Sequence, residues 1–124
     1  MNTQLTDEQK LLQDSVAKFC QNEIPTEKIR GFANLPAGLP AELWQKIAEQ
    51  GWLGLMIPEE YGGLGLGAEE LGIVCEEFGR ALVPGPYLSC VVAARALALG
   101  GTEGAKKVWL EKIATGEAVA TMAL

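Results

Sequence analysis

The side chains of this sequence that could do chemistry are three pairs of adjacent glutamates and three cysteines. The glutamate pairs are Glu59-Glu60, Glu69-Glu70 and Glu76-Glu77. Two carboxylates can share the acid and base roles of a catalytic dyad, but neighbours on a helix point about 100° apart and do not face each other. We therefore expect these pairs to lie on solvated helix faces and to complement helix dipoles.

The cysteines Cys20, Cys75 and Cys90 form no CxxC motif, and their number is odd. This pattern supports neither a disulfide framework nor a zinc site, so we expect three buried thiols in a reducing compartment. The sequence contains no histidine. That absence excludes Ser-His and Cys-His nucleophilic pairs, histidine-ligated metals and histidine general bases. We predict no catalytic residue and no metal ligand in this chain.

The composition is that of an acidic domain with enough apolar residues for a core. The formal charge is −6, and no basic cluster is longer than Lys106-Lys107. Because nucleic-acid binding needs cations that replace phosphate counterions, we expect no nucleic-acid partner. The amino terminus lacks the basic and apolar regions of a secretory signal. The longest apolar run, residues 87–99, is shorter than the roughly 20 residues that span a bilayer. We expect a cytoplasmic protein.

Residues 63–68, Gly-Leu-Gly-Leu-Gly-Ala, have the spacing of the G-x-G-x-x-G/A dinucleotide fingerprint. That fingerprint needs a strand directly before it and an acidic residue about 20 positions after it. Here Pro58 and two glutamates precede it, and the acidic position falls in the turn at residues 84–86. We favour a structural interpretation, a tight crossing of two segments with glycines at positive φ.

The spacing of apolar residues predicts an all-α fold, a bundle of five to six helices. The first helix begins after Thr6, which can form a capping box with Gln9, and Pro25 ends it. Residues 26–39 hold glycines and prolines and are predicted to be a long loop.

A second helix is predicted to begin at Pro40 and to end at Gly51. The apolar residues 52–58 are broken by Gly54 and Pro58, so we expect a buried connection there. A third helix follows the glycine-rich turn and begins at about Ala68.

Two more helices complete the bundle. The fourth covers residues 87–99 and is apolar on nearly every side, which is typical of a helix surrounded by protein. The fifth is capped by Thr102 and ends at Gly116. Its inward residues are predicted to be Ala105, Val108, Trp109 and Ile113.

The fourth helix has two interpretations that its residues leave open. It is either the central core or the wall of an apolar ligand slot. The alanines at 93, 94 and 96 would leave room in such a slot beside the larger Tyr87, Leu88 and Val91. Arg95 is unusual for a core position and implies a carboxylate partner or an exposed edge.

The last residues, 117–124, carry no helix cap and have the length of a strand. A single strand leaves its N–H and C=O groups unpaired, so it needs a partner strand. We therefore predict a helical domain over residues 1–116 and the first strand of a truncated β domain over 117–124. The chain is expected to be one part of a larger protein.

Two segments together resemble the amino-terminal domain of acyl-CoA dehydrogenases. They are the run 52–67, Trp-Leu-Gly-Leu-Met-Ile-Pro-Glu-Glu-Tyr-Gly-Gly-Leu-Gly-Leu-Gly, and Glu-Glu-Phe-Gly-Arg at 76–80. The opening Leu-Thr-Asp-Glu-Gln at 5–9 and the closing Ile-Ala-Thr-Gly-Glu at 113–117 extend the resemblance over nearly the whole chain. Residues 80–86 are similar to bacterial members that act on bulky or unusual acyl thioesters.

The resemblance implies an FAD enzyme of lipid metabolism, including fatty acid β-oxidation. In this family a glutamate base in the carboxy-terminal part removes the proton α to the thioester, and the β-hydride passes to FAD. The electrons leave through an electron-transferring flavoprotein, and the enzymes are usually homotetramers or related assemblies. The amino-terminal domain encloses the acyl chain and excludes water.

The resemblance also implies roles for residues of this chain. Tyr87, Leu88, Val91 and Ala94 would border the acyl cavity, and Met122 and Leu124 would touch FAD. Because the catalytic glutamate and most of the FAD site belong to other segments, we expect the chain alone to be inactive and not to bind FAD tightly. The alternative function is a non-catalytic helical module, on the same fold, that serves assembly or interaction.

Overall fold

The computed structural model describes residues 3–123 of the protein, and within that span the regular structure is helical. Its elements are α1 (Asp7–Glu23), α2 (Thr26–Phe32), α3 (Ala41–Glu49), η1 (Trp52–Gly54), η2 (Glu59–Tyr61), α4 (Ala68–Ala81), α5 (Tyr87–Gly100) and α6 (Glu103–Ala114). The six α-helices of the described residues confirm the predicted all-α class.

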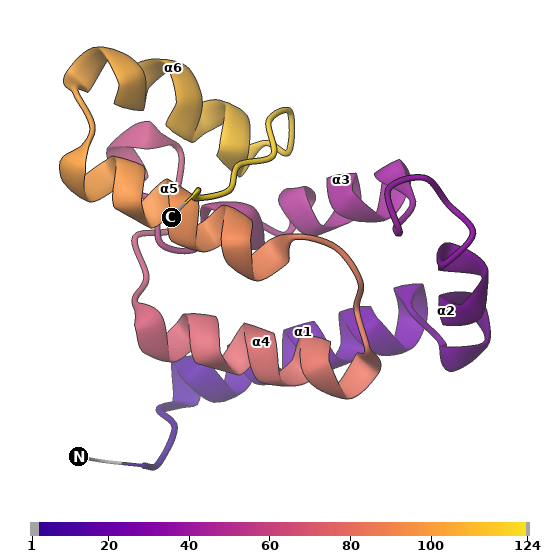
Figure 1. Ribbon diagram of the computed structural model, residues 1–124. Helices are drawn as coiled ribbons and strands as arrows, with labels where there is room; N and C mark the ends of the chain where they lie inside the picture. The colour runs from indigo at the N-terminus through magenta and orange to yellow at the C-terminus, as the bar shows by residue number, and fades with distance from the viewer. Residues whose placement is uncertain (1–2, 124) are drawn as a thin grey trace.

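The helices form two layers (Figure 1). Helices α1 and α4 lie side by side in one layer, and α3, α5 and α6 make up the other. The short turn η1 contacts α3, α5 and α6. Its residues and those that follow are buried, among them Trp52, Leu53, Leu55 and Ile57. The predicted buried connection is thus the centre of the core.

Local signals place the helix ends as predicted. The Gln9 N–H donates to Thr6 Oγ1 at 3.1 Å, and the Thr6 N–H donates to Gln9 Oε1 at 3.0 Å, which completes the capping box of α1. The Thr102 hydroxyl oxygen likewise caps α6. Gly51 has a φ of 85°, a left-handed conformation that closes the turn after α3 without steric cost.

The glycine-rich segment crosses the buried connection closely. A Cβ on Gly63 would lie within van der Waals overlap of the Ile57 carbonyl group. The N–H groups of Leu64 and Leu66 donate to the carbonyl oxygens of Gly54 and Leu55 at 2.9 and 2.8 Å. These contacts confirm the structural interpretation of the glycines, because a side chain at position 63 would separate the two segments.

Two predictions about this architecture are wrong. Residues 26–39 were expected to be a loop, but residues 26–32 form α2, because Pro25 precedes a helical turn and both Ile29 and Phe32 pack against the core. In α6 the buried face differs from the predicted one. Leu110 and Ile113 are buried, whereas Val108 and Trp109, which were predicted to point inward, are half-exposed.

Four aromatic rings tie the layers together. Phe19 of α1, Trp52, Phe78 of α4 and Tyr87 of α5 meet edge to face, with centroid separations of 5.1, 6.1 and 4.8 Å along the series. The Tyr87 hydroxyl donates to the Trp52 carbonyl oxygen at 2.9 Å. This chain of rings fixes the start of α5 against α4.

Residues 117–123 run without helix or strand, as far as the structure describes them. The Ala118 N–H donates to the Lys112 carbonyl oxygen at 3.0 Å, and Ala118 and Ala120 pack against the core while Val119 is exposed. This alternation is that of an extended chain lying on the helices. The assignment of residues 117–124 to a β domain stays a prediction.

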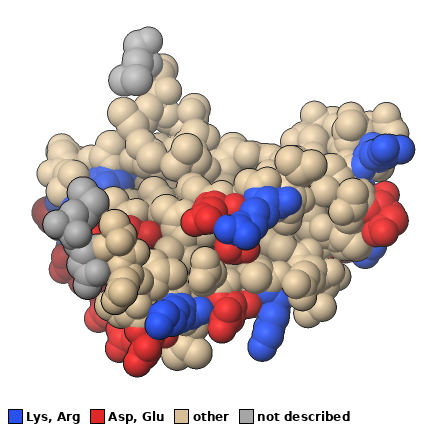
Figure 2. Space-filling model, turned by 90° about the horizontal axis from the view of Figure 1, so that it is seen from below, with Lys and Arg blue, Asp and Glu red and all other residues tan. Residues whose placement is uncertain are grey.

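Of the helices within residues 3–123, none combines the length and the apolar character needed to cross a lipid bilayer. The face that α1 and α4 present below carries acidic and basic side chains side by side (Figure 2). Helices α1 and α4 together carry eight acidic and three basic residues, so negative charge predominates on them.

Candidate functional site

An apolar recess of about 450 Å³ lies where α4 ends and α5 begins. Its lining includes Cys75, Phe78, Gly79, Leu82, Val83 and Leu88. We call it the apolar recess. The connection from α4 to α5 shapes it: Leu82 takes a left-handed φ of 57°, and the Val83 N–H donates to the Phe78 carbonyl oxygen at 2.9 Å.

An exposed apolar stripe on α5 continues from the recess. Leu88, Val92 and Leu99 are 54%, 42% and 70% exposed, although they belong to the most apolar helix of the chain. Their spacing of four and seven residues places them along one helix face. The expectation that α5 is surrounded on all sides is therefore wrong for this face. Contiguous exposed apolar surface is typical of a binding or interaction site.

The four predicted acyl-cavity residues fall on different sides of α5. Leu88 lies on the exposed stripe and borders the recess, and Tyr87 also lines the recess while its ring is buried. Val91 and Ala94 point into the core and are almost fully buried. Sequence reasoning missed Val92 and Leu99, although their spacing from Leu88 is the signal of a shared helix face.

The two predicted FAD contacts lie in the tail. Met122 is exposed near the end of the extended segment, and Leu124 lies outside the described residues. The charged residue of α5, Arg95, is half-buried and has no ion pair with any described side chain. This supports the exposed-edge interpretation of Arg95.

The recess holds uncharged groups. Burial raises the pKa of the Cys75 thiol, and burial, with smaller effects of Cys75 and Cys90, raises the pKa of the Tyr87 hydroxyl. Both groups are therefore protonated near neutral pH. Within residues 3–123, no three His, Cys, Asp or Glu side chains converge as metal ligands would. The recess can bind an apolar group and exclude water, but it offers no base.

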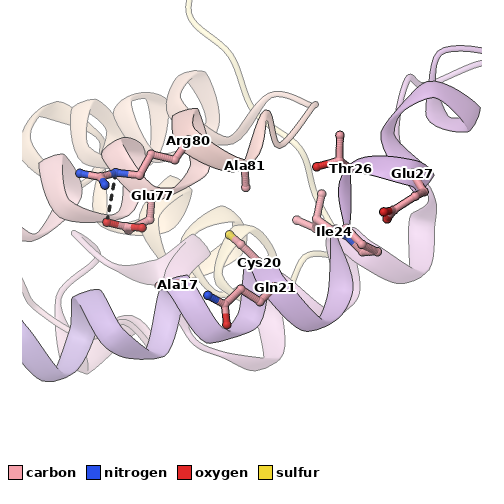
Figure 3. A pocket seen from close by; sticks show the side chains of 10 residues that line it. Ala17, Cys20, Gln21, Ile24, Thr26, Glu27, Glu77, Arg80 and Ala81 are labelled. Atoms are coloured by element: carbon pink, nitrogen blue, oxygen red, sulfur yellow. Dashed lines mark ion pairs between the residues drawn. The ribbon is translucent and has the colours of Figure 1, made fainter.

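A second pocket, of about 540 Å³, lies on the other side of α4, against the end of α1 and the start of α2 (Figure 3). Glu77 and Arg80 lie at one end of it, and Thr26 and Glu27 at the other. Glu77 was predicted to be solvated, but only 8% of it is exposed. That prediction is wrong because α1 covers this side of α4. We call this second site the Glu77 pocket.

The other glutamate pairs behave more nearly as predicted. Glu59, Glu60 and Glu69 are exposed. Glu70 accepts a hydrogen bond from the Gly67 N–H at 3.0 Å and so caps α4. A hydrogen bond from its own backbone N–H, together with one from Gln9, lowers the pKa of Glu70. The acidic start of α4 thus complements the helix dipole.

Comparison with known proteins gives one consistent result. The family described as acyl-CoA dehydrogenase, N-terminal domain, matches residues 6–117. The chain is 35% identical over 120 residues to acyl-CoA dehydrogenase IpdE2 of Mycolicibacterium smegmatis, covering 95% of this chain and 37% of that protein. It is 32% identical over 119 residues to (2S)-methylsuccinyl-CoA dehydrogenase of Cereibacter sphaeroides, covering 94% of this chain and 22% of the relative.

Two solved structures similar to this chain belong to the same family. The Tcur3481-Tcur3483 steroid ACAD G363A variant superposes with a TM-score of 0.85 at 30% identity, over 93% of this chain and 32% of that chain. The acyl-CoA dehydrogenase of Bacillus anthracis complexed with FAD gives 0.77 at 28% identity, over 93% and 20%. The chain therefore spans well under half the length of the proteins that it matches.

Proposed function

The chain belongs to the acyl-CoA dehydrogenase family, as the amino-terminal helical domain, and from that premise we propose that it forms one wall of the acyl pocket in an FAD-dependent dehydrogenase. The observation that carries this proposal is the exposed apolar stripe of α5, which leads from Leu99 to Leu88 and into the apolar recess. Contiguous exposed apolar surface of this kind is typical of a site that meets an apolar partner.

The chemistry of the reaction explains why such a wall is useful. A proton α to a thioester carbonyl is only weakly acidic, so its removal is helped by a water-excluded site around a polarised carbonyl. Leu88 and Val92 would cover the acyl chain and keep water from it. The base would belong to another segment, since the recess contains no ionised group.

The extended tail fits a role beside the cofactor. FAD, when bound, would supply the hydride acceptor that no side chain can provide. Ala118 and Ala120 hold the tail against the helices, and Met122 remains exposed beyond them. We propose that Met122, together with Leu124, contacts FAD in the complete enzyme. The chain alone lacks most of such a site.

We propose a bulky acyl thioester as the substrate. The recess of about 450 Å³ beside Leu88 lies within the size range of small-molecule pockets and would admit more than an unbranched chain. One similar structure is that of a steroid ACAD, and one relative is named for a branched acyl-CoA. We further propose a cytoplasmic oligomer, homomeric or heteromeric, that passes electrons to an electron-transferring flavoprotein.

The experiment is an acyl-CoA oxidation assay on the product of the full reading frame, with a panel of bulky and unbranched acyl-CoA thioesters and an artificial electron acceptor. We expect oxidation of bulky substrates, and Leu88→Trp should lower kcat/KM for them by about tenfold or more because the indole fills the recess mouth. Leu35→Trp is the matched control, because Leu35 is exposed in the loop after α2 and does not line the recess.

The competing function is an assembly module that kept the fold without the chemistry. It is favoured if the gene product carries no flavin and oxidises no acyl-CoA, while Leu88→Trp alters the oligomeric state. If the enzyme is active but Leu88→Trp and Leu35→Trp behave alike, the role of the α5 stripe as an acyl wall is wrong.

A further inference from the structure

The Glu77 pocket contains a carboxylate whose charge is poorly compensated. Gln13 Nε2 donates to Glu77 Oε1 at 3.5 Å, and Arg80 Nε lies 3.7 Å from the same oxygen. The closer contact of Arg80 is with exposed Glu76, whose Oε1 accepts from Nη2 at 2.7 Å. The second oxygen of Glu77, Oε2, has no hydrogen bond or ion pair with any residue that the structure describes. Both contacts of Glu77 are long, and both use one oxygen.

This matters because Glu77 is more than nine-tenths buried. A carboxylate removed from water is costly unless cations or hydrogen-bond donors replace its hydration. Arg80 does this only in part, since its guanidinium is mostly exposed and is shared with Glu76. Oε2 itself is not sealed from solvent, so it remains an open acceptor toward the pocket that Glu77 lines (Figure 3).

The rest of the lining determines what could approach that oxygen. Ala17, Cys20, Ile24 and Ala81 form an apolar surface beside Glu77. The Cys20 thiol is neutral near pH 7, because burial, and then the charge of Glu77, raises its pKa to about 11. Across the pocket, Glu27 adds a second negative charge. The lining thus carries two carboxylates against the single cation of Arg80, which disfavours an anionic ligand.

We propose that the Glu77 pocket binds an alkylammonium group, with the ammonium on Glu77 Oε2 and the methylene stem on the apolar surface of α1. The match is one of shape and charge: the pocket of about 540 Å³ has an accessible carboxylate oxygen beside the apolar side chains of Ala17, Ile24 and Ala81. Charge-assisted hydrogen bonds to a carboxylate are the strongest that such a ligand could make. This site is separated from the apolar recess by α4 and does not depend on the acyl-wall proposal.

The first test is NMR titration of the 124-residue chain with cadaverine, a linear diamine, in low salt. We expect saturable shifts at the amides of Cys20, Glu77 and Ala81, with a dissociation constant of about 1 mM, as befits so small a ligand. Glu77→Gln keeps the volume and one acceptor but removes the charge, so it should weaken binding by about tenfold or more. Glu8→Gln, an exposed change on α1, is the matched control.

A second variant separates binding from folding. Ala17 lines the pocket from α1, so Ala17→Arg would supply a tethered cation for Glu77. Ala17→Arg should abolish cadaverine binding and raise the Tm. Ala17→Leu fills the same space without charge, so it should abolish binding without raising the Tm.

A lysine-containing tripeptide with blocked termini tests whether the alkylammonium group comes from a protein side chain. Tighter binding of the peptide than of cadaverine would assign the site to a lysine side chain of another protein.

Two results would overturn the proposal. One is the absence of saturable shifts with both cadaverine and the peptide. The other is binding that Glu77→Gln weakens no more than Glu8→Gln does, since the amine would then be attracted only by the net acidity of the chain.

Discussion

Helix α4 separates two pockets that differ in almost every respect. On one side lies the apolar recess, which α4 lines with Cys75, Gly79 and Leu82. On the other lies the Glu77 pocket, which α4 lines with Glu77, Arg80 and Ala81. Between them, Val74 and Phe78 point into the core. One helix thus borders both pockets and also contributes side chains to the core.

The comparison shows how differently the two sites depend on their residues. Several apolar side chains line the recess together, so one conservative substitution changes its volume but leaves it apolar. The character of the Glu77 pocket depends on its few charged side chains, Glu77 above all, because their charges decide which ligands are attracted. Each pocket also carries a cysteine, and the two thiols report on their surroundings. The following predictions test this contrast.

The largest effect is expected for Phe78, the α4 residue whose ring lies in the core. Phe78→Ala should lower the free energy of unfolding by about 3–5 kcal/mol, because it removes a buried ring packed between Trp52 and Tyr87. Chemical denaturation of the purified chain measures this. Leu82→Ala, at an exposed position beside the recess, is the control and should cost far less. Similar losses for the two variants would mean that the ring series does not join the layers.

The next effect concerns the cysteine of the Glu77 pocket. Burial and the charge of Glu77 raise the pKa of Cys20 to about 11, so its thiolate fraction at pH 8 should be about a hundredfold below that of an ordinary thiol. Because the neutral thiol is favoured, the alkylation rate should keep rising with pH until the pH exceeds that pKa. Mass spectrometry after iodoacetamide treatment, at a series of pH values, gives the profile.

Cys75 is the internal comparison for that experiment. It lines the recess and is only half-buried. Cys20 should therefore be labelled more slowly than Cys75 at pH 8. Equal rates for both thiols would contradict the different enclosure of the two pockets.

A smaller effect is expected where the recess meets the core. Tyr87→Phe removes the hydrogen bond to the Trp52 carbonyl oxygen but keeps the ring contact with Phe78. The loss should be about 1 kcal/mol, since the Leu55 N–H still donates to the same oxygen. Thermal unfolding measures it, and Tyr61→Phe, whose hydroxyl bonds Glu103 at the surface, is the control. A Tyr61→Phe loss as large as that of Tyr87→Phe would contradict the buried character of the recess wall.

The smallest effect has the opposite sign. Leu82 is the non-glycine residue with positive φ among the described positions, and its side chain is mostly exposed. Leu82→Gly should stabilise the chain by about 0.5–1 kcal/mol, because glycine adopts the left-handed conformation without strain. Leu82→Ala keeps the strain and should show no gain. A loss on Leu82→Gly would mean that the leucine side chain contributes to the recess more than its exposure indicates.

Much of the fold could be predicted from local signals. The capping box of Thr6 and Gln9, the cap at Thr102 and the left-handed Gly51 each act within a few residues, so they hold wherever the helix is placed. The short helix α2 escaped prediction because its seven residues lack a side-chain cap and a long apolar period. Packing of Ile29 and Phe32 stabilises it instead.

The sites were harder to predict. The residues assigned to the acyl cavity differ in exposure: Leu88 borders the recess, whereas Val91 and Ala94 are buried. The sequence could not distinguish them, because a helix that is apolar on all sides gives no periodic signal for its buried face. Which face is covered depends on where η1 and α6 pack. The family's acyl-wall role for these residues stays a prediction.

The sequence by itself determined the helical class, the ends of the helices other than α2, the absence of histidine chemistry and the family resemblance, because these depend on residue types and short spacings. Only the tertiary structure decided which side of α5 is open and that Glu77 is largely buried with one carboxylate oxygen facing a pocket. Burial is set by neighbours that are distant in sequence: α1 covers Glu77 from about sixty positions away. No local pattern around Glu77 carries that information.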